Sequence, residues 1–142
     1  MPIIQVKYST PKAEAGLVQA IAAAASRLSA QHLRKDPAVT AVTVEPVPAE
    51  NWFAGGLSLA EQQRASFFLD IKIVESTNTK DEKAAFIAAV FTTMGDLLGP
   101  LHTESYVHVH DVHAYAYGFG GLTQERRYIA GKLGVAAAQP AA

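Results

Sequence analysis

The chain repeats one pattern of strands and helices twice, and this repeat constrains its fold more than any single residue does. Each copy ends where an aromatic residue precedes a glycine pair by the same step: Trp52 before Gly55-Gly56, and Tyr117 before Gly120-Gly121. Before each of these segments the sequence reads as strand, helix, strand. In a chain of 142 residues, this predicts a single domain over residues 1–130, built from repeats at about 2–56 and 67–121, with an Ala- and Pro-rich tail over 131–142.

The first unit opens with a strand over residues 2–8, where apolar and polar side chains alternate. Thr10 is the expected N-cap of the helix that follows, and Pro11 its first residue. Pro37 cannot continue a helix, so we expect this one to end before it, and residues 39–44 form the second strand. One stripe of this helix is apolar and predicts its buried face: Leu17, Ile21, Ala24 and Leu28.

The second unit repeats this order. Residues 67–74 alternate as a half-buried strand should, and Thr79 with Glu82 forms the sequence pattern of a capping box. Gly99-Pro100 is a strong helix stop, and residues 105–112 form the fourth strand. The apolar stripe of the second helix is Phe86, Val90, Met94 and Leu97.

Each unit links two strands through a helix, so the two strands of a unit should be parallel with a right-handed crossover. Together the units predict an α/β (α+β) fold, with a four-stranded mixed sheet and two helices on one face. The other face would carry a mixture of polar and aromatic side chains, which a subunit interface would explain. They are Gln5, Lys7, Asp70, Lys72, Tyr106, His108 and His110.

The composition excludes several function classes. The formal net charge of −1 gives no basic field for nucleic acid, and the absence of cysteine excludes disulfides, thiolate catalysis and cysteine-based zinc sites. The N-terminus lacks the pattern of a signal peptide, and the longest apolar stretch, residues 84–91, is too short to span a membrane. We therefore expect a cytoplasmic protein with neither nucleic-acid nor membrane partners.

Pro2 is the residue with the clearest chemical potential. Removal of Met1 would leave Pro2 with a free secondary amine, and apolar surroundings or a nearby positive charge would lower the pKa of that amine toward neutrality. Such an amine acts as a general base. If Met1 stays attached, the Pro2 nitrogen is an amide and has no such role.

These features together resemble the tautomerase superfamily. Residues 2–6, Pro-Ile-Ile-Gln-Val, look like the opening of 4-oxalocrotonate tautomerase, and residues 50–56 look like its terminal hairpin. The doubled unit is similar to longer members such as cis-3-chloroacrylic acid dehalogenase, malonate semialdehyde decarboxylase and the macrophage migration inhibitory factor (MIF) group. Residues 117–128 resemble the end of the decarboxylase in particular.

The resemblance implies a trimer in which Pro2 is the catalytic base and cationic side chains hold an acidic small-molecule substrate, with no cofactor and no metal. Lys12 aligns best with a family arginine and is the expected carboxylate ligand, and Trp52, Tyr106 and Tyr117 are the other expected substrate-binding residues. A second family arginine falls near Ala41 and is missing. Residues 74–79 also lack the arginine pair of the dehalogenases and the decarboxylase, which argues against both of those activities.

The sequence leaves alternatives open. The expected function is a tautomerase acting on an enolisable 2-keto acid or a 2-hydroxydienoate. A non-catalytic binding trimer of the same fold is the main alternative, followed by a hydratase, dehalogenase or decarboxylase relative with an altered substrate. His108 and His110 share a strand face and suit either a metal site or, as we favour, a subunit interface. Tyr106 suits either the substrate or that interface.

Overall fold

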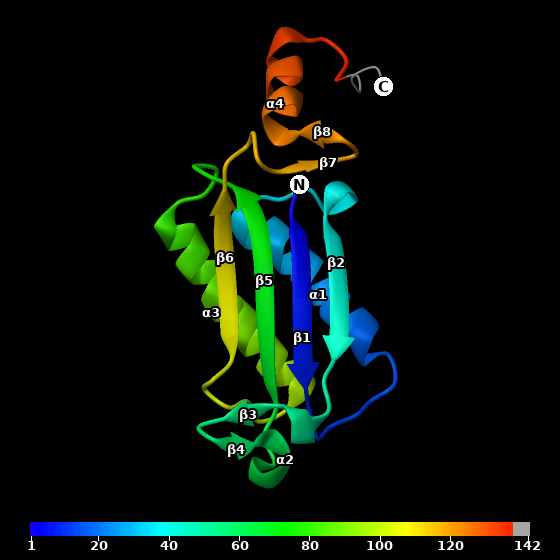
Figure 1. Ribbon diagram of the computed structural model, residues 1–142, viewed down its shortest axis with the longest axis vertical. Helices are drawn as coiled ribbons and strands as arrows, with labels where there is room; N and C mark the ends of the chain where they lie inside the picture. Colours follow the sequence, from blue (N-terminus) through cyan, green and yellow to red (C-terminus); the bar gives the residue numbers. More distant parts are fainter. Residues whose placement is uncertain (138–142) are drawn as a thin grey trace.

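The computed structural model describes residues 1–137, and a four-stranded sheet lies at its centre (Figure 1). The strand order is β2-β1-β5-β6. Strand β1 (Ile3–Ser9) is parallel to β2 (Ala41–Pro46), and β5 (Ser66–Val74) is parallel to β6 (Tyr106–Val112). The two units meet through the antiparallel pair β1 and β5. The predicted mixed sheet of two parallel units is confirmed.

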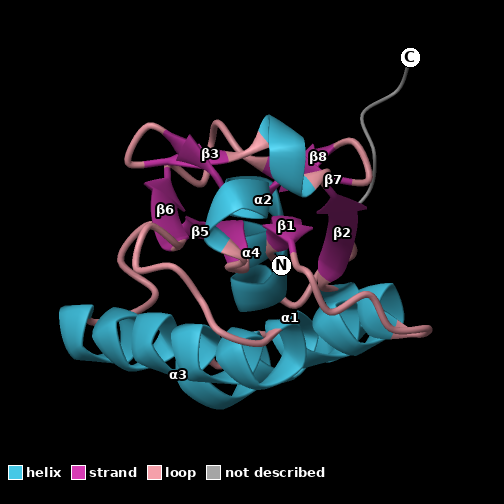
Figure 2. Cartoon of the chain, turned by 90° about the horizontal axis from the view of Figure 1, so that it is seen from below, coloured by secondary structure: helices cyan, strands magenta, loops and turns pink. Residues whose placement is uncertain are grey.

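Two long helices, α1 (Leu17–Leu33) and α3 (Lys80–Leu98), cover one face of the sheet (Figure 2). Their buried stripes match the predicted ones, except that Leu98 takes the fully buried place expected for Leu97. Neither helix covers the opposite face, whose side chains are mostly exposed (Figure 1). The largest fully buried side chains between sheet and helices include Ile4, Val6, Ile21, Leu69, Ile71, Phe67, Phe86 and Val90.

The helix ends follow local rules with one exception. Thr79 and Glu82 form both halves of the predicted capping box, and α3 ends directly before Gly99. The expected start of α1 was wrong, because α1 begins at Leu17 after Gly16, whose φ is 81°. The Thr10 hydroxyl donates to the Leu98 carbonyl instead of capping a helix.

Two small hairpins extend the units, one at each end of the sheet (Figure 1). The first pairs β3 (Phe53–Ala54) with β4 (Leu57–Ser58), and the second pairs β7 (Gly118–Phe119) with β8 (Leu122–Thr123). Both central glycines of each turn have positive φ, 65° and 84° in the first hairpin and 60° and 81° in the second. Two-residue hairpin turns of this kind favour glycine because other residues are strained there.

A helix that the sequence did not predict follows each hairpin. Helix α2 (Leu59–Gln62) is capped by Ser58, and α4 (Gln124–Leu133) is capped by Thr123. Helix α4 crosses the expected domain boundary at residue 130, and residues 138–142 of the expected tail lie outside the described part of the chain. Two short 3-10 turns lie in the first unit: η1 (Pro37–Val39) connects α1 to β2, and η2 (Ala49–Asn51) connects β2 to the first hairpin.

The two ends of the sheet therefore differ in what surrounds them. The β7–β8 hairpin and α4 lie beside the N-terminus, whereas the β3–β4 hairpin and α2 lie at the opposite end (Figure 1). Among residues 1–137, no helix combines the length and the apolar character needed to cross a bilayer. Within the same range, no group of three His, Asp or Glu side chains is arranged to hold a metal ion.

Candidate functional site

Tyr117 and the N-terminal residues form the closest polar contact around Pro2. The Tyr117 hydroxyl accepts a hydrogen bond from the Ile3 backbone N–H at 3.1 Å and donates one to the Met1 carbonyl oxygen at 2.6 Å. These two partners lie on either side of buried Pro2 in the chain. The structure thus brings together two of the predicted site residues, Pro2 and Tyr117.

An apolar cavity of about 440 Å³ opens on one side of the N-terminus. It lies between the first residues of the chain, the 38–41 segment after α1, and the β7–β8 hairpin, and it contains Pro2 and Phe119. Gly118 permits the hairpin to close over it, because a Cβ at this position would lie 2.3 Å from the Leu122 carbonyl oxygen. We call this space the apolar cavity, since its lining carries no charged side chain.

A second cavity, of about 550 Å³, also borders Met1. Residues 74–77, after β5, form one wall, and α4 forms the other. Its lining includes Glu75, Gln124 and Arg127, and we call it the polar cavity. The Arg127 guanidinium lies 3.8 Å from the centre of the Phe119 ring and donates to the Phe119 carbonyl at 3.0 Å. Met1 borders both cavities.

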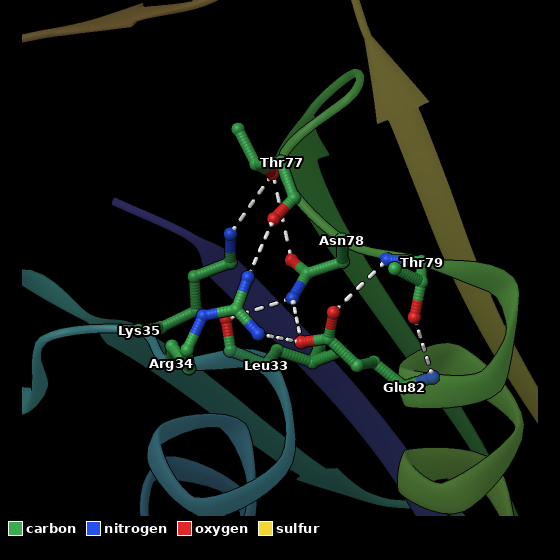
Figure 3. Close-up of polar contacts among 7 residues, drawn as sticks. All are labelled: Leu33, Arg34, Lys35, Thr77, Asn78, Thr79 and Glu82. Atoms are coloured by element: carbon green, nitrogen blue, oxygen red, sulfur yellow. Dashed lines mark hydrogen bonds and ion pairs between the residues drawn. The ribbon is translucent and has the colours of Figure 1, made fainter.

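Lys35 is the cation whose charge acts most directly on the N-terminal amine. It lies in a network that joins the end of α1 to the loop before α3 (Figure 3). Its ammonium donates to the Thr77 hydroxyl at 3.1 Å, and the neighbouring Arg34 pairs with Glu82 and donates to the Thr77 carbonyl at 3.1 Å. The Asn78 amide completes the network, since it donates to the Leu33 carbonyl and to Glu82, each at 3.0 Å.

The electrostatics at the N-terminus favour a neutral amine. Burial lowers the pKa of the terminal amine on Met1, the Lys35 charge lowers it further, and Asp36 opposes this effect. Burial also lowers the pKa of Lys35, with Arg34 repulsion as the next cause. Burial raises the pKa of the Tyr117 hydroxyl, so the hydroxyl remains a hydrogen-bond donor at neutral pH.

The other three predicted site residues lie at the end of the sheet opposite to Pro2. Lys12 follows β1 and pairs with Glu14 at 3.5 Å on the surface. Tyr106 begins β6 and donates to Glu104, and Trp52 precedes the β3–β4 hairpin. Strand β1 has seven residues, and a strand rises about 3.3 Å per residue, so this end of the sheet lies roughly 20 Å from Pro2. Within one chain these side chains do not share a site with Pro2.

The histidines lie on the open sheet face, as the sequence predicted. His108 and His110 stack with ring centres 5.1 Å apart, and His108 lies 3.5 Å from the Asp70 carboxylate, which Lys72 also contacts at 2.8 Å. His113 is separate and pairs with Glu75 at 2.7 Å near the polar cavity.

Sequence reasoning missed Lys35, and it interpreted Arg127 as solvated or paired, with a neighbouring active site as the alternative. A signal for Lys35 was present: a helix that connects two parallel strands returns the chain to the starting end of the first strand, which places the loop after α1 beside Pro2. The position of Arg127 follows from helix α4, which the sequence did not predict because Thr123 was not identified as its N-cap.

Comparison with known proteins identifies the fold. The structure of Pt0534 inactivated by 2-oxo-3-pentynoate superposes with a TM-score of 0.76 and 17% identity, covering 88% of this chain and 98% of that one. A symmetric trimer of a fused 4-OT superposes with a TM-score of 0.73 and 18% identity, covering 87% and 96%. The chain has the tautomerase fold. A MIF-like protein from Entamoeba histolytica shares it, with a TM-score of 0.70 and 17% identity over 86% and 97% of the two chains.

The tautomerase fold is recognised here by structure alone, since no family model and no curated sequence matches the chain. The superposed proteins are nearly fully covered, so the two-unit architecture belongs to the shared fold. The resemblance seen in the short motifs of the sequence is therefore confirmed at the level of the fold.

Proposed function

We propose that the chain is a cofactor-independent tautomerase of small acidic enols, with the Pro2 amine as the general acid–base after removal of Met1. The observation that carries this proposal is the position of the N-terminus, where Met1 borders both cavities and Pro2 lines the apolar one. Burial and the Lys35 charge lower the pKa of the Met1 amine, and we expect them to favour the unprotonated form of the Pro2 amine in the processed chain.

The proposed reaction transfers one proton from the enol oxygen to a carbon atom of the substrate. The free Pro2 nitrogen takes the hydroxyl proton of an enol acid, negative charge develops on the oxygen and the conjugated carbons, and the same nitrogen returns the proton to carbon. The product is the 2-keto acid, and the atoms balance with no other reactant. Arg127 lines the polar cavity and Lys35 contacts Thr77 of its wall, and either cation would stabilise the substrate carboxylate or the developing oxyanion.

A trimer would complete this site, which is our first prediction. The uncovered sheet face and the remote position of Lys12, Trp52 and Tyr106 motivate it. In the trimer, one protomer would contribute the end of its sheet that carries Pro2 to the site, and a neighbouring protomer would contribute the end that carries these three residues. Light scattering should give three times the protomer mass at micromolar concentration, and a stable monomer under these conditions would contradict the proposal.

The second prediction concerns Lys35→Ala. Loss of a charge-assisted hydrogen bond to the substrate should lower kcat/KM by roughly 10- to 100-fold, mostly through KM. Lys35 lowers the pKa of the Met1 amine, and we expect it to act in the same direction on the Pro2 amine of the processed chain, so its removal should also move the rising limb of the kcat/KM profile to higher pH. The measurement is kcat/KM against pH for enolised 2-keto acids.

Asp36→Asn is the matched control with the opposite sign. Asp36 raises the pKa of the terminal amine, so its neutralisation should move the same limb to lower pH. The Asn side chain keeps the oxygen that accepts from the Ala38 N–H at 2.9 Å, so the local turn is preserved. If both variants leave the pH profile in place, Lys35 and Asp36 do not act on the catalytic amine.

A further inference from the structure

The Tyr117 hydroxyl holds the backbone on both sides of the residue that the proposed reaction requires. It accepts from the Ile3 N–H at 3.1 Å and donates to the Met1 carbonyl at 2.6 Å. Its contact with the Lys72 carbonyl is longer, at 3.5 Å. The proton of this hydroxyl is therefore donated to the Met1 carbonyl group, and removal of Met1 removes that acceptor.

The Met1 carbonyl oxygen is separated from the Pro2 nitrogen by only the carbonyl carbon, so the hydroxyl that donates to this oxygen already lies close to the nitrogen of the future amine. Excision of Met1 removes the acceptor and exposes a lone pair on the Pro2 nitrogen beside it. The Ile3 N–H remains as a donor to the hydroxyl oxygen and keeps the ring in place. Burial keeps the hydroxyl protonated at neutral pH, so it still has a hydrogen to donate.

We propose that Tyr117 is a positioning residue whose hydroxyl changes partner when Met1 is removed and then donates a hydrogen bond to the Pro2 nitrogen. This inference rests on the proposed role of Pro2 as a free amine. A hydrogen bond donated to the neutral amine stabilises the unprotonated form. Tyr117 would thus fix the position of the Pro2 nitrogen beside the apolar cavity and lower the pKa of its amine.

Several charged groups also act at this place, and the test must separate Tyr117 from them. Lys35 and Asp36 act from the end of α1, and Lys72 lies on β5 near the Tyr117 hydroxyl. Glu75, Glu125 and Arg127 face the N-terminus across the polar cavity. Tyr117→Phe leaves all six groups in place and removes only the hydroxyl.

The experiment compares processed wild-type protein, Tyr117→Phe and the control Tyr115→Phe. Tyr115 lies on the same connection, stacks on His113 at 5.0 Å and is largely exposed. Proline labelled with ¹⁵N reports the pKa of the Pro2 amine by NMR titration. We expect this pKa to rise by roughly 0.5 to 1 in Tyr117→Phe and to stay at the wild-type value in Tyr115→Phe, from the net strength of one hydrogen bond.

An unchanged pKa in Tyr117→Phe would overturn the inference. The titration needs no substrate, so it decides the role of Tyr117 even if no turnover is found. If Pro2 supports turnover but its pKa is unchanged in Tyr117→Phe, this inference fails and the proposed function stands. Should Tyr117→Phe fail to fold, a crystal structure of processed wild-type protein decides instead. We expect the hydroxyl oxygen within about 3.2 Å of the Pro2 nitrogen, and a hydroxyl bonded to the Lys72 carbonyl in its place would refute the proposal.

Discussion

Placing one alanine before Pro2 should abolish most of the activity, with kcat/KM falling by about 10²- to 10⁴-fold, the usual contribution of a general base. The extension converts the secondary amine of Pro2 into an amide, which has no lone pair available for a proton. It changes no side chain of the site. Steady-state kinetics on enolised 2-keto acids and 2-hydroxydienoates measures the effect.

Protein that retains Met1 provides the matched control for this result. Its Pro2 nitrogen is also an amide, so it should be as inactive as the extended chain. Treatment with a methionine aminopeptidase should then restore activity in parallel with the loss of Met1. Equal turnover by the extended and the processed proteins would mean that the base lies elsewhere, and the histidines of β6 would be the next residues to test.

Phe67→Ala should lower the free energy of unfolding by about 3–5 kcal/mol, the cost expected when a buried phenylalanine is truncated. Phe67 is fully buried between the sheet and the helices, and its ring centre lies 6.4 Å from that of Phe91. Phe67 occupies in the second unit the place that Pro2 has in the first. In the first unit the residue after Pro2, Ile3, pairs with Ala41, the first residue of β2. In the second unit the residue after Phe67, Phe68, pairs with Tyr106, the first residue of β6.

Denaturant unfolding at one fixed protein concentration measures this cost. Phe53→Ala is the control, because Phe53 is 64% exposed on β3, and its truncation should change the stability by no more than about 0.5 kcal/mol. A cost at Phe67 as small as that at Phe53 would contradict the view that the second unit uses this position for the core and the first unit uses it for chemistry.

Much of the fold follows from local patterns in the sequence. Alternating strands, the Thr79 capping box and the Gly99 stop specify elements whose order leaves few possible arrangements, and the crossover rule makes each unit parallel. The start of α1 did not follow, because the Thr10 hydroxyl is used by a distant carbonyl on α3. A tertiary contact of this kind leaves no periodic signal in the sequence.

The candidate site was predicted less completely than the fold. Pro2 and Tyr117 come together because the second hairpin lies over the start of β1, and both were singled out from the sequence. Lys35 was missed although topology alone placed its loop at this end, and the role of Arg127 stayed open because α4 is short and its apolar pattern is weak. Lys12, Trp52 and Tyr106 remain predictions for a site shared between protomers, since one chain cannot bring them to Pro2.

Covalent labelling by 2-oxo-3-pentynoate, the compound that inactivated the structurally similar Pt0534, tests the central claim most directly. A free Pro2 amine would add to the alkyne carbon remote from the ketone, forming a carbon–nitrogen bond while its proton passes to the adjacent alkyne carbon. Mass spectrometry of the processed protein should show one adduct, which peptide mapping places on Pro2, and the protein that retains Met1 should show none. An adduct on Lys35, or equal labelling of both proteins, would contradict a catalytic Pro2 amine.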